Sequence, residues 1–223
     1  MSKKNIKYKI VFHTDWHCGS GLAAGAGVDA LTIKDKNRLP FVPGKTIKGL
    51  VREAVEEILF IGDKMDDIKE RKDNGESKHI SNRELFVETF GNSKDQNIVE
   101  IKDAQTSIDS YQEAHKGKAF FTNATLQQKE YDTIIKNNAA RFMYRTSAST
   151  AIDDSGIAVE NSLRKTEVAI PCECYGEILN VPVAFEEEIS NALKYIKRLG
   201  QGRNRGLGRC TIEITEVEKG GEK

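Results

Sequence analysis

The chain has 223 residues, in which 34 lysines and arginines balance 34 aspartates and glutamates, so its formal net charge is zero. A chain of this length buries roughly 70% of its extended surface and can build a core of its own. Zero net charge excludes a global field that attracts every polyanion, so a nucleic-acid site must come from local clusters of basic residues. The four cysteines lack the spacing of a zinc ribbon or a disulfide framework, and the chain starts without a long apolar segment. These features predict a protein of the reducing cytoplasm without a membrane span.

The first predicted elements are a strand, a glycine-rich loop and a helix. Residues Lys7–His13 alternate apolar and polar side chains, which predicts a half-buried strand. Residues 14–27 contain four glycines and are expected to form a loop, followed by an extended stretch over 28–34. Gly44 opens a helix whose apolar residues recur every three or four positions and should pack on a core. These residues are Ile47, Leu50, Val51, Ala54, Val55, Ile58 and Leu59.

The middle of the chain gives weaker patterns. Residues 62–83 are more than half charged, which predicts a charged surface insertion. A short helix is expected over Arg83–Phe90, ending at Gly91, and the alternation over Asn97–Ala104 predicts a second strand. Residues 107–135 show no period that favours either a helix or a strand.

The last third of the chain begins with a predicted β-hairpin arm over 139–167, in which strand-like stretches flank the turn residues Asp153–Gly156. A strand is then expected over Glu167–Asn180, a helix over Val183–Leu199 and a final strand over Leu207–Val217. The apolar face of that helix consists of Phe185, Ile189, Leu193 and Ile196.

Without the loops and the arm, the predicted order is β, α, β, β, α, β. This order predicts an α+β, ferredoxin-like fold, also called RRM-like because RNA-recognition domains use it, with one open sheet face. Cys172 and Cys174 would lie on one face of a strand, where we interpret them as small buried side chains.

A glycine cluster precedes the last strand. Gly200, Gly202, Gly206 and Gly208 are interleaved with Arg203, Asn204, Arg205 and Arg209. Glycine lets the backbone approach a phosphate closely, and arginine offers forked donors that match phosphate oxygens. The alternative is a tight connection between helix and strand whose arginines are merely solvated.

The segment Gly44-Lys45-Thr46 has the letters that end a phosphate-binding P-loop, but the rest of that motif is absent. Leu39 stands where the motif requires its first glycine, and Pro40 and Pro43 lack amides that the loop would use. What remains is a helix start with Lys45, Thr46 and Lys48, which predicts an anion site.

Two segments, GAGVDALTIKDKNRLPFVPGKTIKGLVREAV and GQGRNRGLGR, resemble the RAMP superfamily. The chain is more closely similar to the repeated backbone subunit of type III CRISPR effector complexes. In that family a glycine-rich loop, an aspartate, an extended stretch and PGxxxKGxxR follow one another. The segment RTSASTAIDDSGIAVENSLRKTEVAIPCECYGEI is similar to the family's thumb hairpin and the strand after it. The resemblance spans nearly the full length and implies a single RAMP domain over 1–223, with 62–83 as an insertion and 139–167 as the thumb.

The resemblance also implies roles for individual residues. Asp29 matches the aspartate of the target-cleaving loop, and Lys48 and Arg52 match the basic residues of PGxxxKGxxR. His17 matches an RNA-contacting position. The full set of expected RNA-binding residues is His17, Lys45, Thr46, Lys48, Arg52, Arg145, Lys165, Arg203, Asn204 and Arg205. A divalent ion, Mg²⁺, is the implied cofactor for cleavage, and no residue is assigned as its dedicated ligand.

The resemblance therefore implies a subunit that binds guide RNA along its length and cleaves complementary target RNA as an endoribonuclease. Its partners would be CRISPR guide RNA, single-stranded target RNA, copies of itself and other type III subunits, with no membrane. One alternative is a non-catalytic RAMP scaffold or capping subunit in which Asp29 is structural. Another is a guide-RNA-processing endonuclease that uses His17 as acid or base. A metabolic ferredoxin-like enzyme is the remaining possibility.

Overall fold

The computed structural model describes residues 3–23, 27–73, 76–91 and 116–220. Its strands are β1 (Lys3–Phe12), β2 (Ile68–Asp73), β3 (Glu76–Ser81), β4 (Phe120–Phe121), β5 (Tyr144–Ser149), β6 (Arg164–Ala169), β7 (Glu173–Pro182) and β8 (Cys210–Lys219). Its α-helices are α1 (Gly44–Ile61), α2 (Asn82–Phe90), α3 (Gln128–Lys136) and α4 (Glu186–Tyr195). Short 3₁₀ helices occupy Ala140–Met143, Val183–Phe185 and Arg203–Arg205.

The central sheet has the strand order β4-β7-β1-β8, and each pair of neighbouring strands in it is antiparallel. Along the chain its elements run β1, α1, β4, β7, α4, β8, which confirms the predicted ferredoxin-like order. Within the described residues, the second strand of that order is Phe120–Phe121. The predicted strand Asn97–Ala104 lies outside the described residues.

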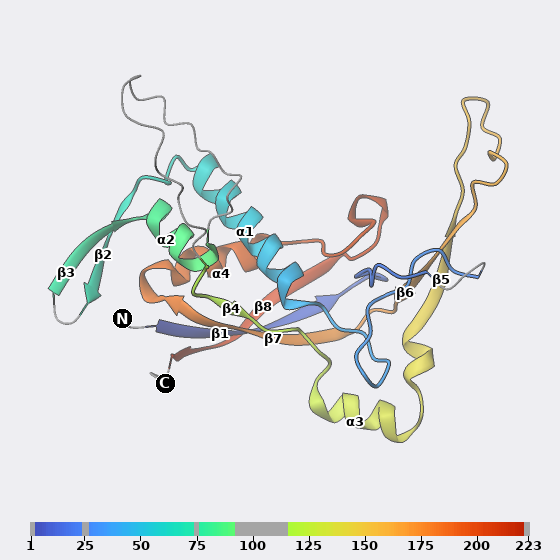
Figure 1. Cartoon of the computed structure of the whole chain (residues 1–223), viewed down its shortest axis with the longest axis horizontal. Coiled ribbons are helices and arrows are strands. Elements are labelled where there is room, and N and C mark those ends of the chain that lie inside the picture. Colours follow the sequence, from blue (N-terminus) through green and yellow to red (C-terminus); the bar gives the residue numbers. More distant parts are fainter. Residues whose placement is uncertain (1–2, 24–26, 74–75, 92–115, 221–223) are drawn as a thin grey trace.

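The core lies between one face of this sheet and the two helices α1 and α4 (Figure 1). Alternate residues of β1 are buried on that face, namely Ile6, Tyr8, Ile10 and Phe12. The predicted apolar stripe of α1 packs there, with Leu50 and Ile58 partly buried and the other members fully buried. The predicted apolar face of α4 is buried as well.

Helix α4 ends earlier than predicted, because residues after Ile196 pair with β8 instead. Arg198 forms a β-bridge with Arg209, and the Cys210 amide donates to the Lys197 carbonyl at 2.9 Å. The prediction of one strand over Glu167–Asn180 is also wrong. This segment is divided between β6 and β7, which belong to different sheets, and the break contains Pro171, which cannot donate to a ladder.

The arm predicted over 139–167 is confirmed as the hairpin of β5 and β6, paired from Tyr144 with Ala169 to Ser149 with Arg164. Figure 1 shows it projecting away from the sheet. The charged segment 62–83 contains a second hairpin, β2 with β3, which the sequence did not predict. Helix α2 follows it directly, with Ser81 and Glu84 forming a capping box. Among the described residues, no helix is long and apolar enough to cross a membrane.

Candidate nucleic-acid interface

The site is built at the end of the sheet where β1 finishes and β7 and β8 begin. The register places Val11 opposite Glu173 and Phe12 opposite Cys210. The loop that follows β1, the loop that precedes β8 and the base of the arm meet at this end (Figure 1). The fold therefore brings together segments that are far apart in the chain. The Gly208 amide donates to the Asp15 carbonyl at 2.7 Å, and the Arg209 amide donates to the Thr14 hydroxyl, 195 positions away, at 3.0 Å.

Two glycines of the loop before β8 are required by packing. A Cβ at Gly200 would lie 2.4 Å from the His17 carbonyl oxygen, and one at Gly208 would lie 1.9 Å from the Leu199 carbonyl oxygen. Both residues have positive φ, 94° and 67° respectively. Gly206 has φ of 89° but open space around it, which fits a tight turn. The alternative interpretation of the cluster as a tight connection thus explains these glycines.

The basic side chains of the same loop point to a further role. Asn204 and Arg205 are exposed, and Arg203 is half-buried. Arg203 lies 3.7 Å from Glu53 of α1, so an ion pair joins the loop to that helix. The loop therefore exposes the side-chain amide of Asn204 and the guanidinium of Arg205 close to α1, the helix that carries Lys48 and Arg52.

The start of α1 differs from the predicted anion site. The Gly44 amide donates to the Asn123 side chain at 2.9 Å, and the Thr46 and Ile47 amides donate to the Pro43 carbonyl. These hydrogen bonds satisfy most of the amides that a phosphate would otherwise use. A phosphate cradle of helix amides is therefore not favoured, and the side chains must carry any anion binding here.

Basic side chains follow one side of α1. Lys45, Lys48 and Arg52 are spaced i, i+3 and i+7, which places them on one helix face. Partial burial lowers the pKa of Lys48, and the nearby positive charges of Arg52 and Lys116 lower it further. The Arg52 guanidinium also lies 5.5 Å from the centre of the Phe86 ring. This group of like charges is suited to an anionic ligand, because a bound phosphate would relieve their repulsion.

Asp29 lies at the base of the arm and is exposed. Its amide donates to the Lys165 carbonyl at 2.8 Å, and its Oδ2 accepts the Lys165 amide at 2.6 Å. Ala30 and Thr166 continue this pairing as a parallel bridge. The Asp29 carboxylate is thus fixed to β6 through one oxygen, next to the half-buried side chain of Lys165.

Glu167, which the sequence did not single out, anchors the arm. Its carboxylate accepts the Thr32 amide at 3.2 Å and the Lys34 ammonium at 2.8 Å. Its carbonyl accepts the Thr32 hydroxyl at 2.8 Å. The Lys34 ammonium also lies 4.1 Å from the centre of the Tyr144 ring on the other arm strand. No local pattern in the sequence indicates this role, because every partner is distant along the chain.

His17 lies inside the protein, with 1% of its surface exposed. Its Nδ1 is 2.6 Å from the Glu167 carbonyl oxygen, which can only accept, so Nδ1 carries the proton and donates. The His17 carbonyl accepts the Gln201 amide at 2.8 Å. This geometry gives His17 a structural role between the arm and the glycine loop. Its predicted contact with RNA stays a prediction; among the described residues, its Nε2 is buried and has no hydrogen-bond partner.

Arg145 of the arm has an ion-pair partner within the chain. It lies 2.8 Å from Asp15, and its side chain remains 59% exposed. The Asp15 side chain is only 22% exposed and its Oδ1 is buried, so separating the pair would leave a buried carboxylate oxygen without its cation. This ion pair fixes Arg145 next to the loop that follows β1, and its predicted contact with RNA stays a prediction.

The open face of the sheet is a poor RNA surface, although the fold is RRM-like. Lys7 pairs with Glu216 at 2.9 Å and with Glu218 at 2.7 Å. Lys9 similarly contacts Glu213 and Glu173. Lysines on this face are thus held by a larger number of glutamates, so the face repels phosphates. The basic residues of α1 and of the glycine loop are therefore the better candidate for an interface.

Within the described parts of the chain, no group of three or more histidine, cysteine or acidic side chains could hold a metal ion. Asp29 alone cannot make a protein-only magnesium site. Mg²⁺, however, usually keeps several waters and binds through one or two carboxylates together with substrate phosphates. One exposed carboxylate at the arm base fits that mode, in which RNA supplies the remaining ligands.

The family model of the RAMP superfamily matches residues 9–211. The chain belongs to the RAMP superfamily. This RAMP protein is also similar to a chain in the cryo-EM structure of type III-B Cmr-beta in the apo state, with a TM-score of 0.62 and 11% identity, covering 95% of this chain and 97% of the other. The structure of type III-B Cmr-beta bound to cognate target RNA gives a TM-score of 0.59 and 10% identity, covering 94% and 96%. No match was found among curated proteins. At these identities the structural likeness establishes the fold of the RAMP protein.

Proposed function

We propose that this RAMP protein is a backbone subunit of a cytoplasmic type III CRISPR effector complex, which binds guide RNA and cleaves complementary target RNA at Asp29. Two similar chains belong to Cmr-beta structures, one of them with cognate target RNA bound. The observation that carries the proposal is the fixed carboxylate of Asp29 at the base of a projecting arm. Its partners are guide RNA, target RNA, further copies of this chain and other effector subunits.

Guide RNA would be held through its backbone. Lys45, Lys48 and Arg52 on α1 and Arg205 on the glycine loop would neutralise phosphates. These contacts carry no sequence information, so specificity would come from pairing between guide and target. The arm, with Arg145 and Lys165 at its base, would separate one target linkage from the guide.

Cleavage places modest demands on the protein. RNA carries its own nucleophile, the 2′-OH, so the main requirement is an in-line geometry at one linkage. The Asp29 carboxylate, held by the Lys165 amide, would accept the 2′-OH proton or orient the attacking group. Mg²⁺ bound by Asp29 and RNA phosphates would stabilise the developing negative charge.

A second function is favoured by the same hydrogen bond. Because Asp29 Oδ2 accepts the Lys165 amide, the carboxylate could serve only to attach its loop to the arm. The RAMP protein would then be a non-catalytic scaffold or capping subunit. A histidine-dependent endonuclease is less favoured, since His17 is 1% exposed.

Two substitutions at Asp29 separate these functions. Asp29→Asn keeps an oxygen that accepts the Lys165 amide but removes the charge, whereas Asp29→Ala removes both. We expect complexes with either variant to bind target RNA and to cleave it at least about 100-fold more slowly with Mg²⁺. Asp154→Asn, at an exposed position of the arm, is the matched control and should cleave normally.

The assay measures cleavage of guide-complementary RNA by the assembled complex, with a chelator control. If Asp29→Asn cleaves as wild type does and only Asp29→Ala is impaired, the carboxylate is structural and the scaffold function is correct. If both variants cleave normally, the nuclease lies elsewhere.

A further inference from the structure

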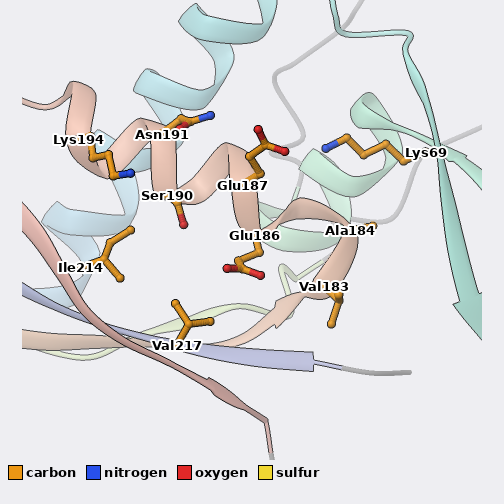
Figure 2. Close-up of a pocket in the computed structure, with 10 residues that line it drawn as sticks. All are labelled: Lys69, Val183, Ala184, Glu186, Glu187, Ser190, Asn191, Lys194, Ile214 and Val217. Atoms are coloured by element: carbon orange, nitrogen blue, oxygen red, sulfur yellow. The ribbon is translucent and has the colours of Figure 1, made fainter.

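A cleft of about 720 Å³ lies between α4 and the outer edge of β8, away from the basic residues described above. Figure 2 shows Ile214 and Val217 pointing from β8 towards α4, with Ser190 facing them. Val183 and Val217 are 41% and 38% exposed. The cleft therefore has an apolar floor that the chain itself leaves in contact with water.

The strand that borders this cleft has an unused edge. β8 is a terminal strand of the sheet and pairs with β1, and among the described residues its opposite edge is bound only at Cys210, whose amide donates to the Lys197 carbonyl. Residues 211–219 make no backbone hydrogen bond to any other described segment. An edge strand of this length, next to a helix and an apolar cleft, is the arrangement that accepts an added peptide strand.

The side chains around the edge define what would be added. Ile214 lies opposite Tyr8 and Val217 opposite Ile6, because an irregularity in the β1–β8 register between them keeps both on the face that carries α4. A strand alongside β8 would therefore place its residues of one face over this apolar floor. The other residues would face the open side of the sheet, where β8 carries Glu213, Glu216 and Glu218, each with 43% or more of its side chain exposed. Opposite charges across neighbouring strands are favourable, so these positions select lysine or arginine.

Charge also excludes the simplest competitor, which is edge-to-edge pairing of two β8 strands. Two copies would bring their glutamates together across the new ladder, which is unfavourable. At the rim Glu187 is exposed, Glu186 is paired with Lys4, and Lys69 and Lys194 also line the cleft, so the preference for a basic strand comes from the β8 glutamates. The edge is therefore protected against self-association and open to a basic strand.

We propose that the β8 edge and the α4 cleft form a docking site for an extended segment of another protein, in which lysine or arginine alternates with aliphatic residues. Main-chain hydrogen bonds to β8 supply the ladder, the aliphatic residues fill the cleft and the basic residues face the glutamates. The site does not depend on RNA binding or cleavage by the same chain.

The test uses the purified chain and a fluorescein-labelled peptide in which lysine and valine alternate. The peptide has about eight residues, which is the length of one strand. Fluorescence anisotropy should show saturable binding to the wild-type protein. Ser190→Arg, which fills the cleft, should weaken binding at least about tenfold. Glu187→Lys, which reverses a charge at the rim, should also weaken it and serves if the first variant does not fold. Glu56→Lys on the exposed side of α1 makes the same charge change away from the cleft and should bind normally.

Two control peptides separate strand addition from charge attraction alone. A peptide with glutamate in place of lysine, and one with alternate backbone amides N-methylated, should both fail to bind. Equal binding of the N-methylated peptide, equal binding by Ser190→Arg and Glu187→Lys, or no binding by the wild-type protein would each overturn the proposal.

Discussion

Replacing Lys48 and Arg52 together with alanine tests the basic face of α1 most directly. Partial burial and the charges of Arg52 and Lys116 lower the pKa of Lys48, so these cations repel one another in the free protein. A bound phosphate would relieve that repulsion. The double variant should therefore bind RNA more weakly, because it lacks two cations that would contact phosphates.

The expected size of the effect follows from counterion release. For single-stranded RNA, each neutralised phosphate adds about 0.7 to the slope of log K against log salt. Losing two contacts lowers the slope by about 1.4, which weakens binding about 25-fold at roughly 0.1 M salt and about 5-fold at roughly 0.3 M. Fluorescence anisotropy with a labelled single-stranded RNA at several salt concentrations measures both quantities.

The matched control removes the same charge from the open face of the sheet. Lys7→Gln with Lys9→Gln changes the net charge equally but acts where glutamates hold the lysines. Its salt slope should stay near that of wild type. If the control loses as much slope as the α1 variant, or if the α1 variant loses none, the interface has been placed on the wrong surface.

Two further predictions concern packing and thiol chemistry. Gly208→Ala should lower the free energy of unfolding in urea by about 3 kcal/mol, because its Cβ would meet the Leu199 carbonyl oxygen at a residue with positive φ. Gly206→Ala, which has open space around it, should lower it by about 1 kcal/mol. Equal losses in the two variants would contradict the packing role of Gly208. At pH 8, iodoacetamide should label Cys172 before Cys18 and Cys210, as mass spectrometry of timed samples can show. A hydrogen bond with Cys174 lowers the pKa of the half-buried Cys172, while burial raises the pKa of Cys18 to about 12 and that of Cys210 to about 11; labelling of all three at one rate would refute this order.

The parts of the fold that the sequence predicted are those with a local periodic signal. The apolar stripe of α1 and that of α4 repeat over several turns, and β1 and β8 alternate over enough residues to define a face. The arm was predictable because its turn residues lie between two strand-like stretches.

What the sequence did not predict depends on distant partners. β4 has two residues, too few for any period, and exists because it pairs with β7. The division between β6 and β7 follows from which sheet each half joins. Lys116 joins the basic face of α1 from a segment without a pattern, and burial of His17 arises from Glu167 and Gln201. A list of charged residues in the sequence cannot reveal such relations.

The arm and the proposed cleavage residue are parts of one hydrogen-bonded unit. The Asp29 carboxylate accepts the main-chain amide of Lys165 in β6. Two residues further along β6, the Glu167 carboxylate binds Thr32 and Lys34, which lie on the segment after Asp29. A displacement of the arm must therefore carry Asp29 with it or break these bonds. If the arm is what exposes one RNA linkage, the carboxylate is already positioned by the same strand that creates the exposure. This coupling would allow the proposed cleavage site to work with a single acidic residue, because the geometry of the RNA and the position of the carboxylate would be set together.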